Sequence, residues 1–524
     1  MTRRLVIVHP SKLRGENHGV YIQHVASLRW LLDGNEGWSV AALDPLHPAF
    51  ADAVLASDLV VVHMLPHREI DALLRLRRAR NLPTLFEFSD NFLDLGDWLP
   101  KRHLFRSPLV RQNLLHYASR CDAVQVYAPG LAELFRHVNP NVIVFDPYVP
   151  IASPRPVKPD GFVFGWGGTT SHETDLARIA PAIVAFCAAH RDATFAFMGD
   201  EAMFARHFAA IAPEQTRVAP FGAYDAYLEF VRGLHAGLAP LHDSGFNAGR
   251  TDTKFATYAA SAVVPLLEDA PLHRPHADRA RLFRDADELR AALEALYADR
   301  AECHAFADRA YAWAQRERGE ATLRQQRIDA YRALLPSQPV ADAPLVIDPA
   351  PPEASRLLEF SMQKPDAALE TARAIADAHP GYVQAQWAVA TTLEALARYD
   401  EAFAHAERIA WPPLYAELAA ELKARLARRV RPADAARYLD AVASPLIRLR
   451  LSASAQRDKS AFFRAVLREQ PYDYFALSAI IRVLQETNSD SSELDELYAR
   501  ACLVSPELVP RDRRPAALVP FLPT

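Results

Sequence analysis

The sequence predicts two doubly wound α/β domains followed by an all-α domain. Three observations indicate this fold class. Short apolar runs alternate with helical patterns in the first two segments, proline-dense stretches separate the segments, and the last segment carries a helical repeat. The proline-dense stretches are 146–160 and 336–352. Because proline fixes φ and lacks an N–H donor, neither stretch suits a long helix or a central strand. We therefore expect domains at about 1–146, 160–335 and 353–524.

The strand candidates of both α/β domains are short, continuous apolar runs, the pattern of strands buried on both faces. In the first domain they span 4–9, 59–63, 84–88, 123–127 and 142–145. In the second domain they span 162–166, 194–198, 217–221, 236–241 and 263–267. Helical intervals such as 22–32 separate the strands, which predicts parallel sheets of the Rossmann type. Ligands of such sheets bind beyond the carboxyl ends of the strands, so we expect the site in a cleft between the domains.

The third segment is rich in alanine and leucine and contains an internal repeat. Asp366 and Asp400 begin similar phrases, DAAL and DEAF, at an offset of 34 residues, and Asp434 continues this offset. A 34-residue period of helix pairs resembles tetratricopeptide (TPR) repeats, and an irregular helical bundle is the alternative. TPR-like arrays present extended surfaces that usually bind protein segments. Because proline-rich connectors seldom carry core packing, we expect removal of 353–524 to leave a soluble two-domain core.

Composition excludes several classes of protein. The formal net charge of −5, from 59 basic and 64 acidic residues, is too small to indicate a nucleic-acid or membrane-surface protein. No apolar run approaches the roughly 18 residues that a membrane span needs. The four cysteines lie far apart without metal-ligand spacing, so we expect no disulfide, no metal site and a cytoplasmic location.

The most informative stretch is 238–260, LAPLHDSGFNAGRTDTKFATYAA. A strand end and a loop of small residues precede Arg250, Asp252 and Lys254, which open a predicted helix. A helix N-terminus favours anions, and arginine and lysine both bind phosphate oxygens. This arrangement predicts a phosphate site. The alternative is that Arg250 and Lys254 are solvated neighbours of Asp252 on the helix surface.

A second stretch, 165–175 (GWGGTTSHETD), follows the first predicted strand of the second domain. Gly167 and Gly168 allow a ligand to approach the backbone closely, Thr169 follows them, and His172 is within reach of a phosphate or a sugar hydroxyl. In a βα series this turn and the 250–254 helix start both follow strands of one sheet. A simple glycine turn with a hydrogen bond from His172 at the helix start is the alternative.

These residues carry a resemblance to a known family. The second domain resembles the nucleotide-sugar-binding half of GT-B glycosyltransferases, in particular the retaining group called family 4 or group 1. In that group a strand ends in a phrase such as PL-x-D-x-x-FN-x-G-x-(S/T)-D-x-K-F-x-EYAA. This chain matches it at Pro240-Leu241, Asp243, Phe246-Asn247, Gly249, Thr251-Asp252, Lys254-Phe255 and Tyr258-Ala259-Ala260. Thr257 departs from the pattern, because the family usually has there a glutamate that holds the ribose hydroxyls.

The resemblance implies a glycosyltransferase that moves a sugar from a nucleotide-sugar donor to a protein or glycan acceptor, retains the anomeric configuration and needs no metal. It implies a donor site made by residues of the second domain: Gly167, Gly168, Thr169, His172, Phe246, Asn247, Arg250, Asp252, Lys254 and Thr257. It also covers the first domain, where 86–92 (FEFSDNF) is similar to the phrase (Y/F)-E-x-D-D, with Asn91 in place of the second aspartate. A helical stretch at 305–335 is of the kind that crosses back to the first domain.

The acceptor side has fewer candidates. Asp90 follows a predicted strand, where a carboxylate can orient an acceptor hydroxyl or accept its proton; capping of the next turn is the alternative. Glu16, Asn17 and His18 occupy the loop after the first strand and are candidates for acceptor contacts or for simple solvation. We expect His63, at another strand end, to be packed.

The role of 353–524 leaves three hypotheses open. This segment recruits a protein acceptor, or it docks an assembly partner of an enzyme that extends a lipid-linked or polysaccharide glycan. The third hypothesis is a catalytically inactive GT-B and TPR scaffold, which Thr257 suggests.

Overall fold

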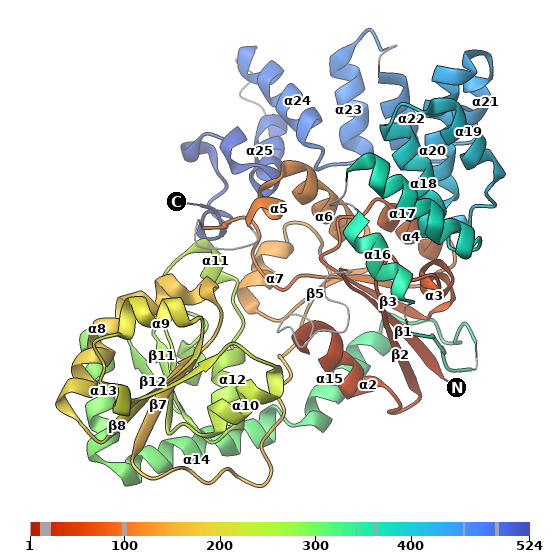
Figure 1. Cartoon of the computed structure of the whole chain (residues 1–524). Coiled ribbons are helices and arrows are strands. Elements are labelled where there is room, and N and C mark those ends of the chain that lie inside the picture. The colour runs from red at the N-terminus through yellow and green to blue at the C-terminus, as the bar shows by residue number, and fades with distance from the viewer. Residues whose placement is uncertain are drawn as a thin grey trace.

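The computed structural model describes residues 2–10, 22–96, 102–341, 343–349, 351–360, 364–453, 456–487 and 492–523. It contains two six-stranded parallel sheets, each in its own α/β domain, and a helical C-terminal region (Figure 1). The predicted fold class, two tandem Rossmann-like domains followed by helices, is therefore confirmed. No helix among these residues has the length and apolarity that crossing a membrane requires.

The first sheet has the strand order β2-β1-β3-β4-β5-β6, with all neighbouring strands parallel. Its strands are β1 (Arg3–Val8), β2 (Trp38–Leu43), β3 (Leu59–His63), β4 (Thr84–Glu87), β5 (Ala123–Val126) and β6 (Val142–Val144). Its helices are α2 (Ser27–Leu32), α3 (Phe50–Ala56), α4 (Glu69–Arg78), α5 (Arg102–Arg106), α6 (Pro108–Arg120) and α7 (Pro129–Phe135). The sequence analysis did not predict β2, an edge strand that is only partly buried.

The second sheet has the order β12-β11-β10-β7-β8-β9, the Rossmann order with its direction reversal between β7 and β10. Its strands are β7 (Phe162–Gly167), β8 (Ala193–Gly199), β9 (Thr216–Pro220), β10 (Ala236–Ala239), β11 (Val264–Glu268) and β12 (Arg281–Phe283). Its helices are α8 (Glu173–Ala189), α9 (Glu201–Phe208), α10 (Tyr224–Arg232), α11 (Gly245–Ala248), α12 (Thr253–Ala260) and α13 (Ala286–Ala298). The sequence did not predict the short edge strand β12.

Two helices lead the chain back from the second domain to the first. α14 (Arg300–Glu317) packs on α12, and α15 (Glu320–Arg332) packs on α2 (Figure 1). Leu323, Ile328 and Tyr331 of α15 are buried in the hydrophobic core that lines one face of the first sheet. This arrangement holds the two domains together at a second place besides the site described below.

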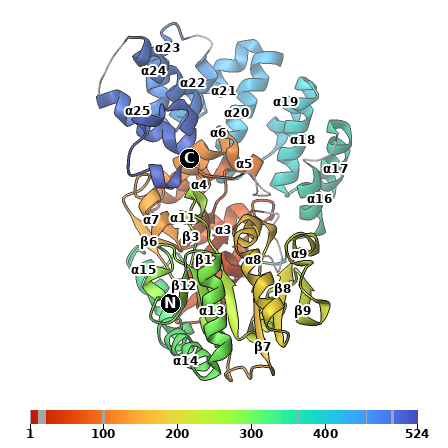
Figure 2. The same ribbon diagram turned by 90° about the vertical axis from the view of Figure 1, so that its left-hand side faces the viewer.

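The C-terminal region is a series of helices in which most elements pack on the next one in the chain. They are α16 (Pro352–Phe360), α17 (Pro365–Ala378), α18 (Val383–Ala395), α19 (Tyr399–Arg408), α20 (Pro413–Val430), α21 (Ala435–Asp440), α22 (Pro445–Ser452), α23 (Lys459–Glu469), α24 (Tyr474–Glu486) and α25 (Ser492–Val504). The 34-residue offset places Asp366 in the first turn of α17 and Asp400 in the first turn of α19. Both views show these helices lying over the first domain (Figure 1, Figure 2).

The helical region and the first domain share one hydrophobic core. Leu414 and Leu418 of α20 and Ile480 of α24 belong to the same buried cluster as Leu73 of α4 and Leu115 of α6. Ion pairs join the same surfaces, between Arg68 and Glu421 and between Arg75 and Glu417. The helical region is therefore fixed to the first domain by apolar packing as well as by charge.

The segment between α15 and α16, expected to be a connector, lies against the first domain. The Arg4 Nε–H donates to the carbonyl of Ala343 at 2.6 Å, and the Leu345 N–H donates to Ser39 Oγ at 3.2 Å. The sequence predicted that removal of 353–524 would leave a soluble two-domain core. The shared hydrophobic core argues against this, because the truncated chain would expose an apolar face of the first domain.

Candidate active site

The candidate site lies at the direction reversal of the second sheet. β7 and β10 are neighbours there, and the loops that follow them both lie beyond their carboxyl ends. The loop after β7 carries the glycine turn, and the segment after β10 leads through α11 to the N-terminus of α12. The two motifs that are about 80 residues apart in the sequence thus meet where Rossmann-like sheets bind ligands.

Arg250 connects both domains at this place. Its guanidinium donates to Asp90 Oδ1 at 3.0 Å and to His172 Nε2 at 2.9 Å. It also stacks 4.7 Å above the centroid of the Phe246 ring. Four of the predicted site residues, including Asp90 from the loop after β4, are thereby brought into one cluster.

Asp175 fixes the orientation of His172. Its Oδ2 accepts a hydrogen bond from His172 Nδ1 at 2.9 Å, and its Oδ1 accepts one from the Asn247 side-chain amide at 3.1 Å. Burial and the neighbouring Arg250 lower the pKa of His172 to about 4, so the imidazole is neutral near pH 7. With its proton on Nδ1, His172 presents the Nε2 lone pair to the Arg250 guanidinium.

Lys254 is the second cation of the cluster. Its ammonium group donates to the carbonyl of Gly167 and lies 5.1 Å from the centroid of the Trp166 ring. Burial and the nearby Arg250 lower the pKa of Lys254 to about 7. A bound anion would favour the protonated form of Lys254. A diphosphate would therefore offset the repulsion between the two adjacent cations.

The two glycines have different roles. A Cβ at Gly167 would lie 2.9 Å from the Tyr227 ring, so this glycine allows α10 to pack closely on β7. A Cβ at Gly168 would lie 2.8 Å from the Trp166 ring and 3.2 Å from Lys254 Nζ, so this position faces the cluster. The Gly168 N–H donates to the carbonyl of Met198 at 3.0 Å, and Thr169 Oγ1 bonds Ser171 Oγ at 2.7 Å.

Asp252 and Thr257 have other partners than expected. The buried Asp252 carboxylate forms ion pairs with Arg318 at 2.7 Å and with His276 at 3.3 Å. It therefore ties the start of α12 to the end of α14 instead of joining the cation cluster. The Thr257 hydroxyl donates to the carbonyl of Thr253 at 2.7 Å within α12, and this side chain is buried.

Asn91 joins three parts of the chain next to the site. Its side-chain amide donates to the carbonyl of Gly245 at 2.8 Å and to the carbonyl of Phe521 at 2.9 Å. The Phe246 N–H donates to Asp94 Oδ2 at 3.2 Å. The loop after β4, the start of α11 and the C-terminal tail are thus held together beside Asp90.

The remaining acceptor candidates, Glu16, Asn17 and His18, lie outside the described residues. Asp175 was not among the predicted site residues, although the spacing His172-x-x-Asp175 was visible in the sequence. The contacts of Asn91 with Gly245 and Phe521 had no signal in the sequence, because they join residues 154 and 430 positions apart.

Comparison with known proteins gives only distant likenesses. No family model matches the sequence, and a search of curated proteins finds no match. Among solved structures, a TarM mutant from S. aureus is 8% identical, covering 52% of this chain and 55% of its own, with a TM-score of 0.38. A Thermobaculum terrenum O-GlcNAc transferase mutant is 14% identical, covering 64% and 67%, with a TM-score of 0.40.

A third solved structure, the trehalose 6-phosphate synthase from Burkholderia multivorans, is 13% identical and also has a TM-score of 0.40. This match covers 64% of this chain and 99% of the synthase. The match to the TarM mutant spans only about half of that protein's own length. At these identities and TM-scores, the functional assignment rests on the geometry of the site.

Proposed function

We propose that the chain is a nucleotide-sugar-dependent glycosyltransferase that transfers a sugar to a protein or glycan acceptor. The observation that carries the proposal is the contact of Arg250 with Asp90. It sets a cation at the ligand-binding edge of the second sheet against a carboxylate from the first domain, 3.0 Å away. A donor held by the second domain would therefore present its sugar next to Asp90.

In the proposed complex, Arg250 and Lys254 bind the diphosphate of the donor. Their charges would stabilise the nucleoside diphosphate as it leaves, which is the role of a metal ion in other transferases. The proposed transfer step therefore needs no metal at the diphosphate. Phe246 packs against the Arg250 guanidinium, Asn247 holds Asp175, and Gly168 leaves room next to Lys254.

Donor binding would also release Asp90. A diphosphate offers the Arg250 guanidinium a stronger, bidentate partner than a single carboxylate does. Once freed, the Asp90 carboxylate can orient an acceptor hydroxyl or accept its proton. We propose retention of the anomeric configuration on the ground of the family resemblance. We propose front-face attack in place of a covalent intermediate, because Asp90 is the one carboxylate among the described residues that pairs with Arg250.

The helical region is proposed to recruit the acceptor. Its α20, α24 and α25 pack on α4 and α6, and its tail reaches Asn91 beside Asp90. A protein segment bound along these helices would therefore be held on the same side of the first domain as the candidate base. A TPR-like array is suited to this role, since it presents an extended binding surface.

The test is the release of nucleoside diphosphate from a panel of UDP-, GDP-, ADP- and dTDP-sugars by the full chain without acceptor. We expect slow hydrolysis of one donor, and loss of this activity in Arg250→Ala. Arg274→Ala removes an exposed arginine that pairs with Asp269 in the same domain, and should be unaffected. Failure of the wild-type chain to hydrolyse or bind any donor would contradict the proposal.

A further inference from the structure

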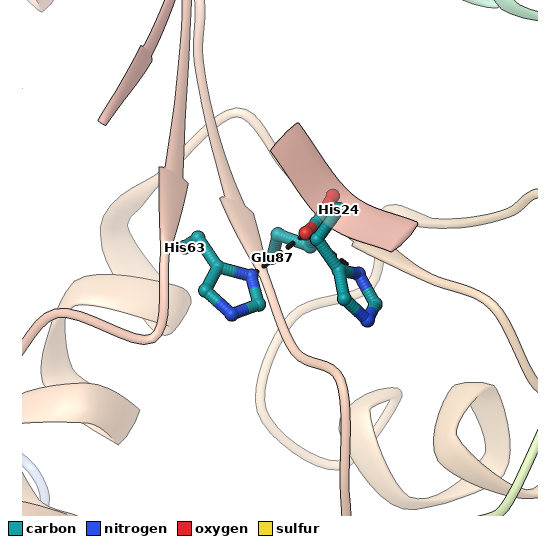
Figure 3. A group of neighbouring side chains, drawn as sticks. All are labelled: His24, His63 and Glu87. Atoms are coloured by element: carbon teal, nitrogen blue, oxygen red, sulfur yellow. Dashed lines mark hydrogen bonds and ion pairs between the residues drawn. The ribbon is translucent and has the colours of Figure 1, made fainter. Parts of the chain in front are cut away.

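A second cluster of ionisable side chains lies at the carboxyl edge of the first sheet. His63 ends β3 and Glu87 ends β4, while His24 comes from the short helix η2 (Ile22–Ala26). All three side chains are buried. Figure 3 shows the Glu87 carboxylate between the two imidazoles. The cluster is separate from Arg250 and Lys254, which belong to the second domain.

The three side chains direct their ligand atoms at one place. His63 Nδ1 lies 2.8 Å from Glu87 Oε1, and His24 Nδ1 lies 3.0 Å from the same oxygen. The ligand atoms of the three residues all lie within 4.8 Å of one another. His24 Nδ1 is nevertheless without a hydrogen bond to any described residue, although it is buried. Hydrogen bonding within the cluster therefore leaves one buried nitrogen unsatisfied.

The other oxygen of Glu87 is held from outside the cluster. Glu87 Oε2 accepts hydrogen bonds from the Tyr127 hydroxyl at 3.1 Å and from the Gln125 amide. Gln125 Oε1 in turn accepts from the Tyr331 hydroxyl of α15 at 2.9 Å. Outer partners of this kind fix ligating carboxylates in metal sites. They leave Oε1 directed at the two imidazoles.

We propose that His24, His63 and Glu87 bind a divalent transition-metal ion. Two imidazoles and one carboxylate are donors typical of Zn²⁺ and Fe²⁺, whereas Mg²⁺ and Ca²⁺ prefer oxygen ligands. Around a tetrahedral Zn²⁺ the ligand atoms lie about 3.4 Å apart, from bond lengths of about 2.0–2.2 Å. Binding would therefore move His63 Nδ1 and His24 Nδ1 away from Oε1 by about 0.6 and 0.4 Å, from their present distances of 2.8 and 3.0 Å. Three protein ligands leave at least one position for water or another small ligand.

Metal binding at this site can be measured separately from the proposed transfer reaction. The ligands of the site come only from the first domain, and the diphosphate would be held by the second. Glu87 precedes Asp90 by three residues, so an ion there would also fix the strand end that carries the candidate base. Metal binding and donor binding can each fail without the other, and separate measurements distinguish them.

The test is titration of the chelator-treated full chain with Co²⁺ and then Zn²⁺. We expect one equivalent of Co²⁺ to produce visible d–d absorption, which Zn²⁺ then removes, and one equivalent of metal by elemental analysis. Absence of stoichiometric binding to the wild-type chain would overturn the proposal, whatever the variants do.

Variants locate the ion. His63→Ala and Glu87→Gln should weaken binding at least 100-fold, more than the loss of an outer partner costs. His116→Ala is the matched control, since His116 is also a buried histidine beside a carboxylate, Asp71, in the first domain. Circular dichroism reports whether each variant folds. Unchanged Co²⁺ absorption in a folded His63→Ala chain would place the ion elsewhere and overturn the assignment.

Discussion

At the scale of single residues, two sets of acceptors compete for the Arg250 guanidinium. Without donor it binds Asp90 and His172, and with donor it would bind phosphate oxygens. The candidate base is therefore neutralised by an ion pair until the donor arrives. This exchange predicts an order of binding in which the donor precedes the acceptor.

Asp90→Asn tests the role of Asp90 as a base separately from donor binding by Arg250. The amide nearly preserves the shape of the side chain but removes its charge and its capacity to accept a proton. We expect transfer to fall about 10²- to 10⁴-fold, as for loss of a general base. Donor affinity should stay the same or increase, because Arg250 loses a competing carboxylate. Steady-state transfer rates and donor titration of the same protein check both expectations, and a normal rate would make Asp90 only a structural partner of Arg250.

Lys254 predicts a pH dependence of anion binding. Its pKa is lowered to about 7 in the free protein, so the protonated fraction falls as the pH rises above 7. Because an anion binds the protonated form better, the Kd for a nucleoside diphosphate should rise between pH 7 and 9, by up to about tenfold per unit. Calorimetric titration at several pH values measures this slope. In Lys254→Arg the side chain stays charged over this pH range, so the Kd should depend less on pH. An equally steep dependence in this variant would assign the titration to another group.

The sequence predicted some of these residues and not others, for physical reasons. Arg250, Lys254 and His172 follow strands of one sheet, and parallel topology brings such positions together. The sequence also suggested Asp252, since its charge lies in the same phrase. The structure pairs it with Arg318, which directly follows α14 and is 66 residues away in the sequence. A local motif indicates which charged side chains follow a strand. It does not indicate which distant residues pair with those side chains.

At the scale of elements, the buried Asp252–Arg318 pair links the start of α12 to the end of α14. Asp252→Asn removes one of the two carboxylates that pair with the Arg318 guanidinium, while the more exposed Asp146 stays 2.8 Å from it. We expect a loss of about 1.5–3 kcal/mol in the free energy of unfolding, as for a hydrogen bond to a charged group. Denaturant unfolding measures this loss. Diphosphate affinity, measured below the unfolding transition, should change little, whereas a large loss of affinity with normal stability would restore Asp252 to the donor site.

The strands show a similar division between what was predictable and what was not. The ten runs predicted as strands all correspond to strands. Eight of them are largely buried, as expected for continuous apolar runs in parallel sheets. β6 and β9, each at one edge of its sheet, were predicted although they are only partly buried. β2 and β12, at the opposite edges, were not predicted.

At the scale of the whole molecule, the helical region and the first domain form one unit. The proline-dense stretch 336–352 predicted a separable domain. The composition of a linker, however, carries no information about the surface on which the following helices pack. Leu414, Leu418 and Ile480 are buried against the first domain. The tail adds the contact of Phe521 with Asn91 next to the site.

A chain that ends before residue 353 is therefore expected to aggregate, since it would expose the apolar surface that α20 and α24 cover. Light scattering after size-exclusion chromatography and thermal unfolding measure this outcome. Arg373→Glu in the full chain, at an exposed position of α17, is the control and should remain monodisperse. A monodisperse truncated chain with a wild-type Tm would show that the shared core is not needed by the first two domains.

The central claim is that Arg250 and Lys254 form the diphosphate site of a sugar donor. Calorimetric titration of the full chain with UDP, GDP, ADP and dTDP tests it most directly. We predict that one of them binds the wild-type chain and that Arg250→Ala and Lys254→Ala each weaken its binding roughly 10- to 150-fold, the loss of about 1.5–3 kcal/mol for a charge-assisted hydrogen bond. Wild-type affinity in both variants, or no binding to the wild-type chain, would contradict the claim.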